Sequence, residues 1–125
     1  MDNKVLIFDD DEDILEVCSI VLRTNGFTVA IQNNCEGVLQ KLDHHRPDVV
    51  LMDNKIPPLG GIPACQTIRA SIAHARIPIV FFSANLDVAR LATEAGADFF
   101  IEKPFDLDEL VSVLRQACNG RATAG

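Results

Sequence analysis

The sequence predicts an α/β fold: a doubly wound, five-stranded parallel sheet with five helices. Continuous apolar runs, such as residues 49–52, recur along the chain and are typical of strands buried on both faces. Segments with apolar residues at helical spacing separate these runs. Strands that alternate with helices favour right-handed crossovers and therefore a parallel sheet.

The first predicted strand, residues 4–8, ends on two acids, Asp9 and Asp10. The helix after it runs from about residue 13 to a stop at Asn25 and Gly26. Its predicted buried stripe consists of the apolar residues at helical spacing: Ile14, Val17, Cys18 and Val21.

The middle of the chain continues the alternation. β-branched and aromatic residues predict a short strand at 27–31, and a helix at 34–45 follows, which Pro47 prevents from continuing. The third strand ends at Asp53. The loop 57–61, Pro-Pro-Leu-Gly-Gly, breaks both helix and strand.

The rest of the chain continues the alternation of helices and strands. We expect helices at 62–73, 87–95 and 107–118 and strands at 78–82 and 98–101. Gly96 ends the second of these helices. Asp106 opens the last one, with its carboxylate expected on the backbone amide of Glu109. The predicted buried stripe of this helix is Leu107, Leu110, Val111 and Leu114.

Polar residues follow four of the five strands. We expect the flavodoxin-like strand order 2-1-3-4-5, in which the first and third strands are neighbours at the switch point where ligands bind. Asp9 and Asp10 then meet Asp53, and Ser83 and Lys103 reach the same rim from the fourth and fifth strands.

The length and charge limit the possible functions. The 125 residues fit one domain, expected at 1–119, with 120–125 as a linker stump or residues added for expression. No apolar run approaches the roughly 18 residues of a membrane span, and the N-terminus lacks the features of a signal peptide, which favours a cytoplasmic protein without membrane contact. The net charge of -7 repels a phosphate backbone, so we expect no direct nucleic-acid binding.

The four cysteines, Cys18, Cys35, Cys65 and Cys118, are widely spaced and lack the spacing of metal ligands, which favours buried or free thiols.

The acids at the predicted rim indicate metal-assisted chemistry. Crowded carboxylates repel one another, so they raise a pKa or hold a hard cation, and oxygen ligands suit Mg2+ or Mn2+. A metal-neutralised carboxylate can attack phosphorus to give an aspartyl phosphate if nearby groups stabilise the transferring oxygens. Lys103 and Ser83 offer an ammonium and a hydroxyl for this purpose.

Residues 4–118 resemble the receiver domain of two-component response regulators, including the chemotaxis regulators. The motifs that carry the resemblance are Phe8-Asp9-Asp10, Asp53 after an apolar strand, Ser83-Ala84 and Lys103-Pro104-Phe105. The resemblance implies that Asp53 is the phosphoacceptor, Asp10 a direct metal ligand and Asp9 a ligand through water. It also implies a metal contact from the Lys55 carbonyl, phosphoryl contacts from Ser83 and Lys103, and a cis Lys103–Pro104 peptide.

The resemblance further implies a switch and two partners. Phe100 occupies the position of the aromatic switch, often Tyr in the family, and Lys55 and Asn85 occupy the positions that set the lifetime of the phosphoryl group. The donor would be a histidine kinase or a histidine phosphotransfer domain. An output partner, whose identity the sequence does not reveal, would recognise the surface of helix 87–95, strand 98–101 and the last helix. The domain would catalyse only its own phosphorylation and dephosphorylation.

Two other functions, a phosphatase and a pseudo-receiver, are compatible with parts of the sequence, and the first helix offers a candidate docking surface. A haloacid-dehalogenase-like phosphatase also uses a strand-terminal Asp nucleophile with Mg2+, but it requires a second Asp two residues after the nucleophile. Two residues after Asp53 the chain has Lys55, which does not fit. Two residues after Asp9 it has Asp11, which keeps this alternative open. A pseudo-receiver would mediate contacts without phosphorylation. Leu15 and Leu22 lie off the predicted stripe of the first helix and are expected to be exposed, possible docking residues for the donor.

Overall fold

The computed structural model describes the backbone of residues 3–124 and the side chains of residues 3–119. Its strands are β1 (Lys4–Phe8), β2 (Thr28–Gln32), β3 (Val49–Asp53), β4 (Ile79–Ser83) and β5 (Phe99–Glu102). Its helices are α1 (Glu12–Thr24), α2 (Val38–His45), α3 (Gly61–Ala70), α4 (Val88–Ala95) and α5 (Leu107–Ala124).

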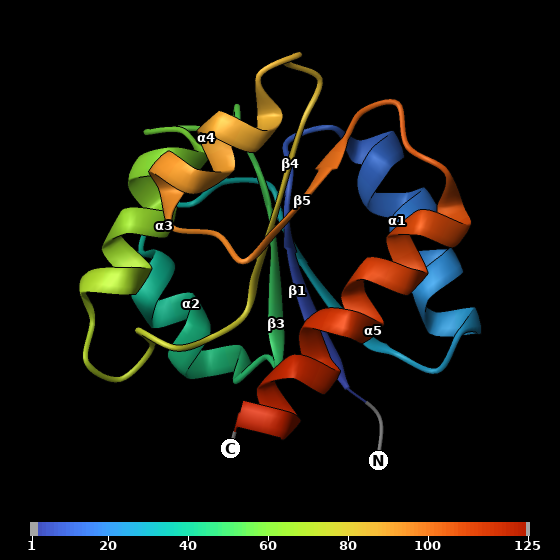
Figure 1. Ribbon diagram of the computed structural model, residues 1–125, viewed down its shortest axis with the longest axis horizontal. Helices are drawn as coiled ribbons and strands as arrows, with labels where there is room; N and C mark the ends of the chain where they lie inside the picture. The colour runs from blue at the N-terminus through green and yellow to red at the C-terminus, as the bar shows by residue number, and fades with distance from the viewer. Residues whose placement is uncertain (1–2, 125) are drawn as a thin grey trace.

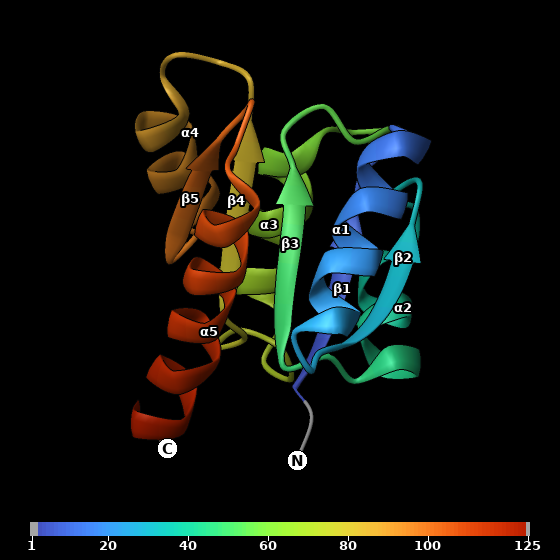
Figure 2. The same ribbon diagram turned by 90° about the vertical axis from the view of Figure 1, so that its right-hand side faces the viewer.

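The five strands form one parallel sheet in the order β2-β1-β3-β4-β5, which confirms the predicted architecture. Figure 1 shows α2, α3 and α4 on one face of the sheet and α1 and α5 on the other. All strand pairs are parallel, and Figure 2 shows the arrows of β2, β3 and β4 pointing toward the same end of the molecule. The carboxyl ends of the strands therefore share one rim.

The central strands are buried on both faces, as their continuous apolar runs predict. Along β1, Leu6 and Phe8 pack under α2 and α3, whereas Val5 and Ile7 pack under α1 and α5. Every residue of β3 and β4 is buried. Burial on this scale stabilises by roughly 1.5–3 kcal/mol for each large apolar side chain, and it fixes the strand ends that carry the polar residues.

The buried face of α1 differs from the prediction. Leu15 and Leu22 are buried, at 5% and 0% exposure, so the expected docking patch of these two residues is wrong. Val17, which the predicted stripe placed inside, is 44% exposed. The sequence of α1 contains two apolar stripes that share Cys18. The helix buries the stripe that contains Leu15 and Leu22, because these two long side chains, seven residues apart, fill the space above the sheet.

Smaller differences concern helix ends. α2 begins at Val38 rather than residue 34, because Gly37 adopts a left-handed conformation with φ of 61°. The Asp106 carboxylate accepts from the amide of Asp108 rather than of Glu109. Leu107, at the first residue of α5, is 39% exposed rather than buried.

The predicted tail, 120–125, lies within the last turns of α5 as far as Ala124, and Gly125 lies outside the described residues. The domain boundary at residue 119 stays a prediction. Within the described part of the chain, no helix has the length and apolar character required to cross a bilayer.

All four cysteines are buried, in agreement with one of the two expectations from their spacing. Burial raises the pKa of the Cys18 and Cys65 thiols to about 12, so both stay protonated at neutral pH.

The orientation of α1 can be tested by stability measurements. Leu22→Ala should lower the free energy of unfolding by roughly 2–5 kcal/mol, because it leaves a cavity in the core. Val17→Ala, on the exposed side of the same helix, should change it by about 0.5 kcal/mol or less. Urea denaturation followed by circular dichroism measures both. Equal losses for the two variants would contradict the orientation described here.

Candidate functional site

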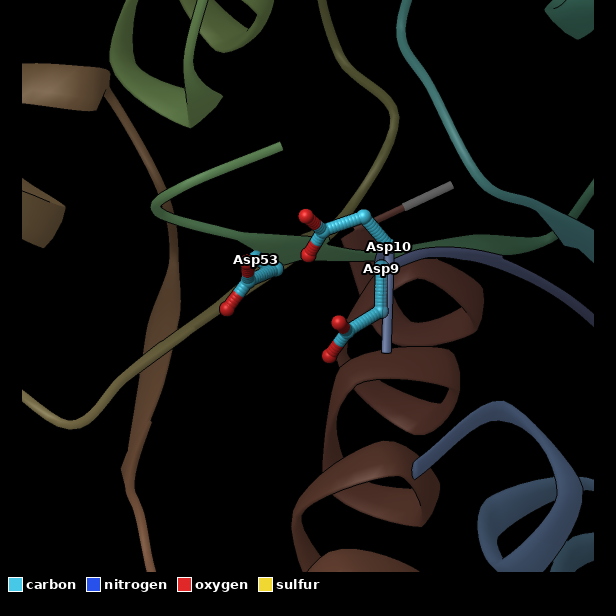
Figure 3. A group of neighbouring side chains, drawn as sticks. All are labelled: Asp9, Asp10 and Asp53. Atoms are coloured by element: carbon cyan, nitrogen blue, oxygen red, sulfur yellow. The ribbon is translucent and has the colours of Figure 1, made fainter. Parts of the chain in front are cut away.

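Three carboxylates gather at the carboxyl ends of β1 and β3. Figure 3 shows the side chains of Asp9 and Asp10, which follow β1, beside that of Asp53, the last residue of β3. Each can offer an oxygen within 4.8 Å of the oxygens offered by the other two. Asp9 and Asp53 are buried, whereas Asp10 is exposed. The expected meeting of these acids follows directly from the pairing of β1 with β3.

The Lys103 ammonium lies between the two buried acids. Its Nζ is 3.0 Å from Asp9 Oδ2 and 2.8 Å from Asp53 Oδ1, and it donates a hydrogen bond to each. The same Nζ lies 4.3 Å from the centre of the Phe82 ring, a cation–π contact that also shields it from solvent. Lys103 follows β5, and its backbone amide donates to the Ser83 carbonyl, which holds the two strand ends together.

Burial and charge shift the pKa values in this cluster. Burial raises the pKa of Asp9 above its ordinary value of 3.8, and the nearby Asp53 charge acts in the same direction; the Asp11 amide and Lys103 oppose this only in part. Burial alone would lower the pKa of Lys103, but the hydrogen bonds and charges of Asp53 and Asp9 outweigh it and the pKa is raised. The ammonium is therefore fully charged at neutral pH.

Backbone contacts fix the orientation of Asp53. Its Oδ2 accepts a hydrogen bond from the Lys55 amide at 3.1 Å, while Oδ1 is held by Lys103. The first turn of α3 lies against the Asp53 backbone, so closely that a Cβ added to Gly61 would lie 2.4 Å from the Asp53 carbonyl oxygen. Only glycine fits there, and the acid is held from both its side chain and its backbone.

The other predicted residues lie around this cluster. Ser83, at the end of β4, is buried, and its Oγ accepts from the Asn85 amide at 3.0 Å. The Asn85 side chain accepts in turn from the amide of Asp87. Phe100, on β5, is 48% exposed and so is turned outward. The Lys103–Pro104 peptide bond is cis.

Two contributors to the site, Phe82 and Gly61, are not evident as site residues in the sequence. Phe82 belongs there to an apolar run, and Gly61 to the loop 57–61. The apolar run of β4 does not indicate which of its aromatic rings will contact a lysine, so the contact between Lys103 and Phe82 could not be predicted from the sequence. The Gly60-Gly61 pair next to a loop was a signal for a close backbone approach.

The donor set fits a hard divalent cation. Three carboxylates face one ammonium, which leaves two negative charges in excess when all are ionised. The ligands are oxygen atoms only, and Asp10 is open to solvent, so water can complete the coordination of an ion such as Mg2+. Asp9, Asp10 and Asp53 are the residues able to hold it.

The raised pKa of Asp9 predicts how stability depends on pH. Because the folded protein binds this proton more tightly than the unfolded chain, ionised Asp9 destabilises the fold. The cost is absent below the ordinary pKa of 3.8, grows as the pH rises toward the folded-state pKa, and is complete above it. Asp9→Asn should therefore stabilise the metal-free protein at neutral pH, by about 1 kcal/mol.

This prediction is checked by thermal melts in EDTA at several pH values. The stabilisation should shrink toward acid pH, where the wild-type carboxyl is protonated. If Asp9→Asn were less stable than the wild type at neutral pH, the hydrogen bonds of the Asp9 carboxylate would outweigh the cost of its burial and of its repulsion from Asp53, which would contradict the prediction.

Comparisons with known proteins agree with this geometry. The response regulator receiver domain family matches residues 5–115. The DNA-binding response regulator MtrA of Mycobacterium tuberculosis is 38% identical over 117 residues, which cover 92% of this chain and 50% of MtrA. The chain thus spans about half the length of the curated relatives it matches.

Solved structures give the same result. A putative response regulator from Chloroflexus aurantiacus superposes with a TM-score of 0.90 at 27% identity, over 95% of this chain and 99% of that one. The receiver domain of the sensor histidine kinase PA1611 from Pseudomonas aeruginosa, with magnesium in its active site cleft, superposes with a TM-score of 0.86 at 28% identity, over 95% and 99%. With three acids and a lysine at one rim of a 2-1-3-4-5 sheet, and a family match over most of its length, this chain belongs to the response regulator receiver domains.

Proposed function

We propose that Asp53 accepts a phosphoryl group from a phosphohistidine donor and that the resulting aspartyl phosphate switches the surface of the domain. The observation that carries this proposal is the Lys103 ammonium held 2.8 Å from Asp53 Oδ1, beside two further acids. In the transfer, an Asp53 carboxylate oxygen attacks phosphorus, the bond from phosphorus to the histidine nitrogen breaks, and that nitrogen keeps the electron pair.

The neighbours of Asp53 have the chemistry that this transfer requires. Lys103 places a positive charge where it can neutralise the transferring phosphoryl oxygens, and the Ser83 hydroxyl, at the end of the neighbouring strand, can donate to another. Asp10, Asp53 and the Lys55 carbonyl would hold Mg2+ or Mn2+ directly, with Asp9 acting through water. The ion supplies charge neutralisation between the carboxylates and the phosphoryl group.

The switch is proposed to begin at Ser83. To donate to a phosphoryl oxygen, the Ser83 side chain would move toward Asp53, which would change the hydrogen bond that its oxygen now accepts from the Asn85 amide. Phe100, now outward, then moves into the space that Ser83 leaves, and the surface of α4, β5 and α5 changes for an output partner. Phe100 brings no hydroxyl to this movement, unlike tyrosine. Lys55 and Asn85, at the two positions that flank the path of the hydrolytic water in the family, set the lifetime of the phosphoryl group.

The corrected orientation of α1 changes the proposed donor surface. With Leu15 and Leu22 in the core, the apolar side chain that α1 presents beside α5 is Val17, flanked by the half-buried Ile14 and Val21. A histidine kinase or histidine phosphotransfer domain would dock there, in the cytoplasm. This domain itself would not contact nucleic acid or membrane.

The structure gives less support to the two alternatives. A phosphatase of the haloacid dehalogenase type needs a second acid near the nucleophile, but the Asp11 carboxylate accepts from the amides of Asp13 and Ile14 and caps α1 instead. A pseudo-receiver has no use for a partly buried lysine between two buried acids, an arrangement that costs desolvation energy. Both alternatives make different predictions from phosphorylation of Asp53.

Incubation with Mg2+ and a small acyl phosphate should add one phosphoryl group per chain, as measured by intact-protein mass spectrometry. Asp53→Asn should abolish the addition, because the amide is not a nucleophile toward phosphorus. Asp43→Asn, a matched change at an exposed acid paired with His74 on the loop after α3, should leave it intact.

Three results would contradict the proposal. Labelling that survives Asp53→Asn would move the acceptor elsewhere. No labelling of the wild type, with metal binding intact, would favour the pseudo-receiver, and steady turnover of a phosphate monoester would favour the phosphatase.

The donor surface has its own test. Val17→Asp should slow phosphoryl transfer from the cognate donor about tenfold or more, because it places a charge in an apolar contact. It should leave labelling by the small acyl phosphate unchanged, since Val17 is remote from Asp53. Quenched time courses of phosphorylation with each donor measure the two rates. An unchanged rate of transfer from the protein donor would show that Val17 is not part of the docking surface.

A further inference from the structure

A groove separate from the acidic site runs between α1 and the edge strand β2. It encloses about 680 Å³. Figure 2 shows α1 with β2 on one side and α5 on the other, so the groove lies on the side of α1 that faces away from α5. The residues that line its length are contributed by both elements and by the start of the loop after β2.

The centre of the groove is apolar and incompletely packed. Ile20 on α1 is 58% exposed and Ile31 on β2 is 47% exposed, and both line the groove. Between them the small side chain of Ser19 forms part of the floor, and its buried hydroxyl has no hydrogen-bond partner within residues 3–119. Exposed isoleucines beside a hollow are typical of a surface that is covered by another molecule.

The ends of the groove carry opposite charges. Glu12 and Glu16 lie on the first turns of α1, beside the end of β2, and Arg23 lies on the last turn, beside its beginning. The Arg23 guanidinium donates to the Val29 carbonyl at 3.2 Å, but no described carboxylate lies within ion-pair distance of it. Because Arg23 already covers this edge carbonyl, the groove is unsuited to the addition of another strand to β2.

We propose that this groove is the interface of a symmetric homodimer, with a second copy of the same chain as its occupant. A two-fold axis through the centre of the groove reverses the second copy. Arg23 of each copy then faces Glu12 and Glu16 of the other, and Ile20 of each copy enters the hollow above Ser19 of the other. A surface with opposite charges at its two ends and apolar residues at its middle is complementary to itself in this arrangement alone.

The interface is compatible with the rest of the molecule. It leaves free the acidic rim and the surface of α4, β5 and α5, because the groove lies beside β2, at the opposite edge of the sheet from β5. The dimer therefore forms without phosphorylation of Asp53, and its test does not depend on the proposed chemistry.

Sedimentation velocity over about a hundredfold range of concentration should show a monomer–dimer equilibrium for the wild type. Ile20→Asp should abolish the dimer, because it places a charge at the apolar centre. Arg23→Glu should raise the dissociation constant about tenfold or more, because like charges then face one another. Ile72→Asp, at a fully exposed isoleucine on the loop after α3, is the matched control and should leave the equilibrium unchanged.

Charge reversal provides the decisive variant. Glu16→Arg should weaken the dimer as Arg23→Glu does, and the double variant Glu16→Arg, Arg23→Glu should recover part of the lost affinity, because the facing charges are opposite again. Circular dichroism verifies that each variant is folded. A wild type that stays monomeric at every concentration would overturn the proposal, as would a dimer that tolerates both Ile20→Asp and Arg23→Glu. Binding of a different protein in this groove by a chain that remains monomeric would overturn it as well.

Discussion

The contact of the Lys103 ammonium with Asp9 and Asp53 is the interaction on which the site depends. Two buried carboxylates and a third exposed one repel one another, and one ammonium offsets only part of that repulsion. Burial of Asp9, together with its repulsion from Asp53, raises the pKa of Asp9. A fold that keeps such a cluster is less stable than it would be with neutral residues there, and the excess negative charge is what suits the cluster to a divalent cation. The Lys103 ammonium holds Asp53 in place and, under the proposed function, would also neutralise part of the charge of an incoming phosphoryl group.

The sheet is what makes this cluster possible. β1 and β3 are neighbours although α1, β2 and α2 separate them in sequence, and their buried runs anchor Asp9 and Asp53 from below. Gly61 lets α3 start directly against the Asp53 backbone, so the acid cannot retreat from its neighbours. Ser83 and Phe100 lie on the adjacent strands, β4 and β5. In the proposed switch, a change at Asp53 would reach the outer surface through these two residues. The fixed position of Asp53 is thus a consequence of the sheet topology and of Gly61.

Much of this arrangement could be predicted from residue patterns. The apolar runs and the intervening helices predicted the sheet and its order, and the acids at the ends of two runs predicted their meeting, because strand ends in a parallel sheet share one rim. The prediction failed where the pattern allowed two answers. α1 has two overlapping apolar stripes that share Cys18, and only packing against the sheet decides that Leu15 and Leu22 face inward. Likewise, the contact between Lys103 and Phe82 depends on side-chain directions that no spacing encodes. The chain itself shows only the surfaces on which the proposed partners would bind. It covers about half the length of relatives such as MtrA.

The central claim is that the Asp53 carboxylate itself carries the phosphoryl group. Borohydride reduces an acyl phosphate to an alcohol, so treatment of the phosphorylated protein followed by peptide mass spectrometry marks the acceptor directly. The account predicts that the aspartate at position 53 becomes homoserine, that Asp9 and Asp10 stay unmodified, and that the conversion needs Mg2+ during phosphorylation. Homoserine at position 9 or 10, or a phosphoryl group that borohydride leaves in place, would contradict it.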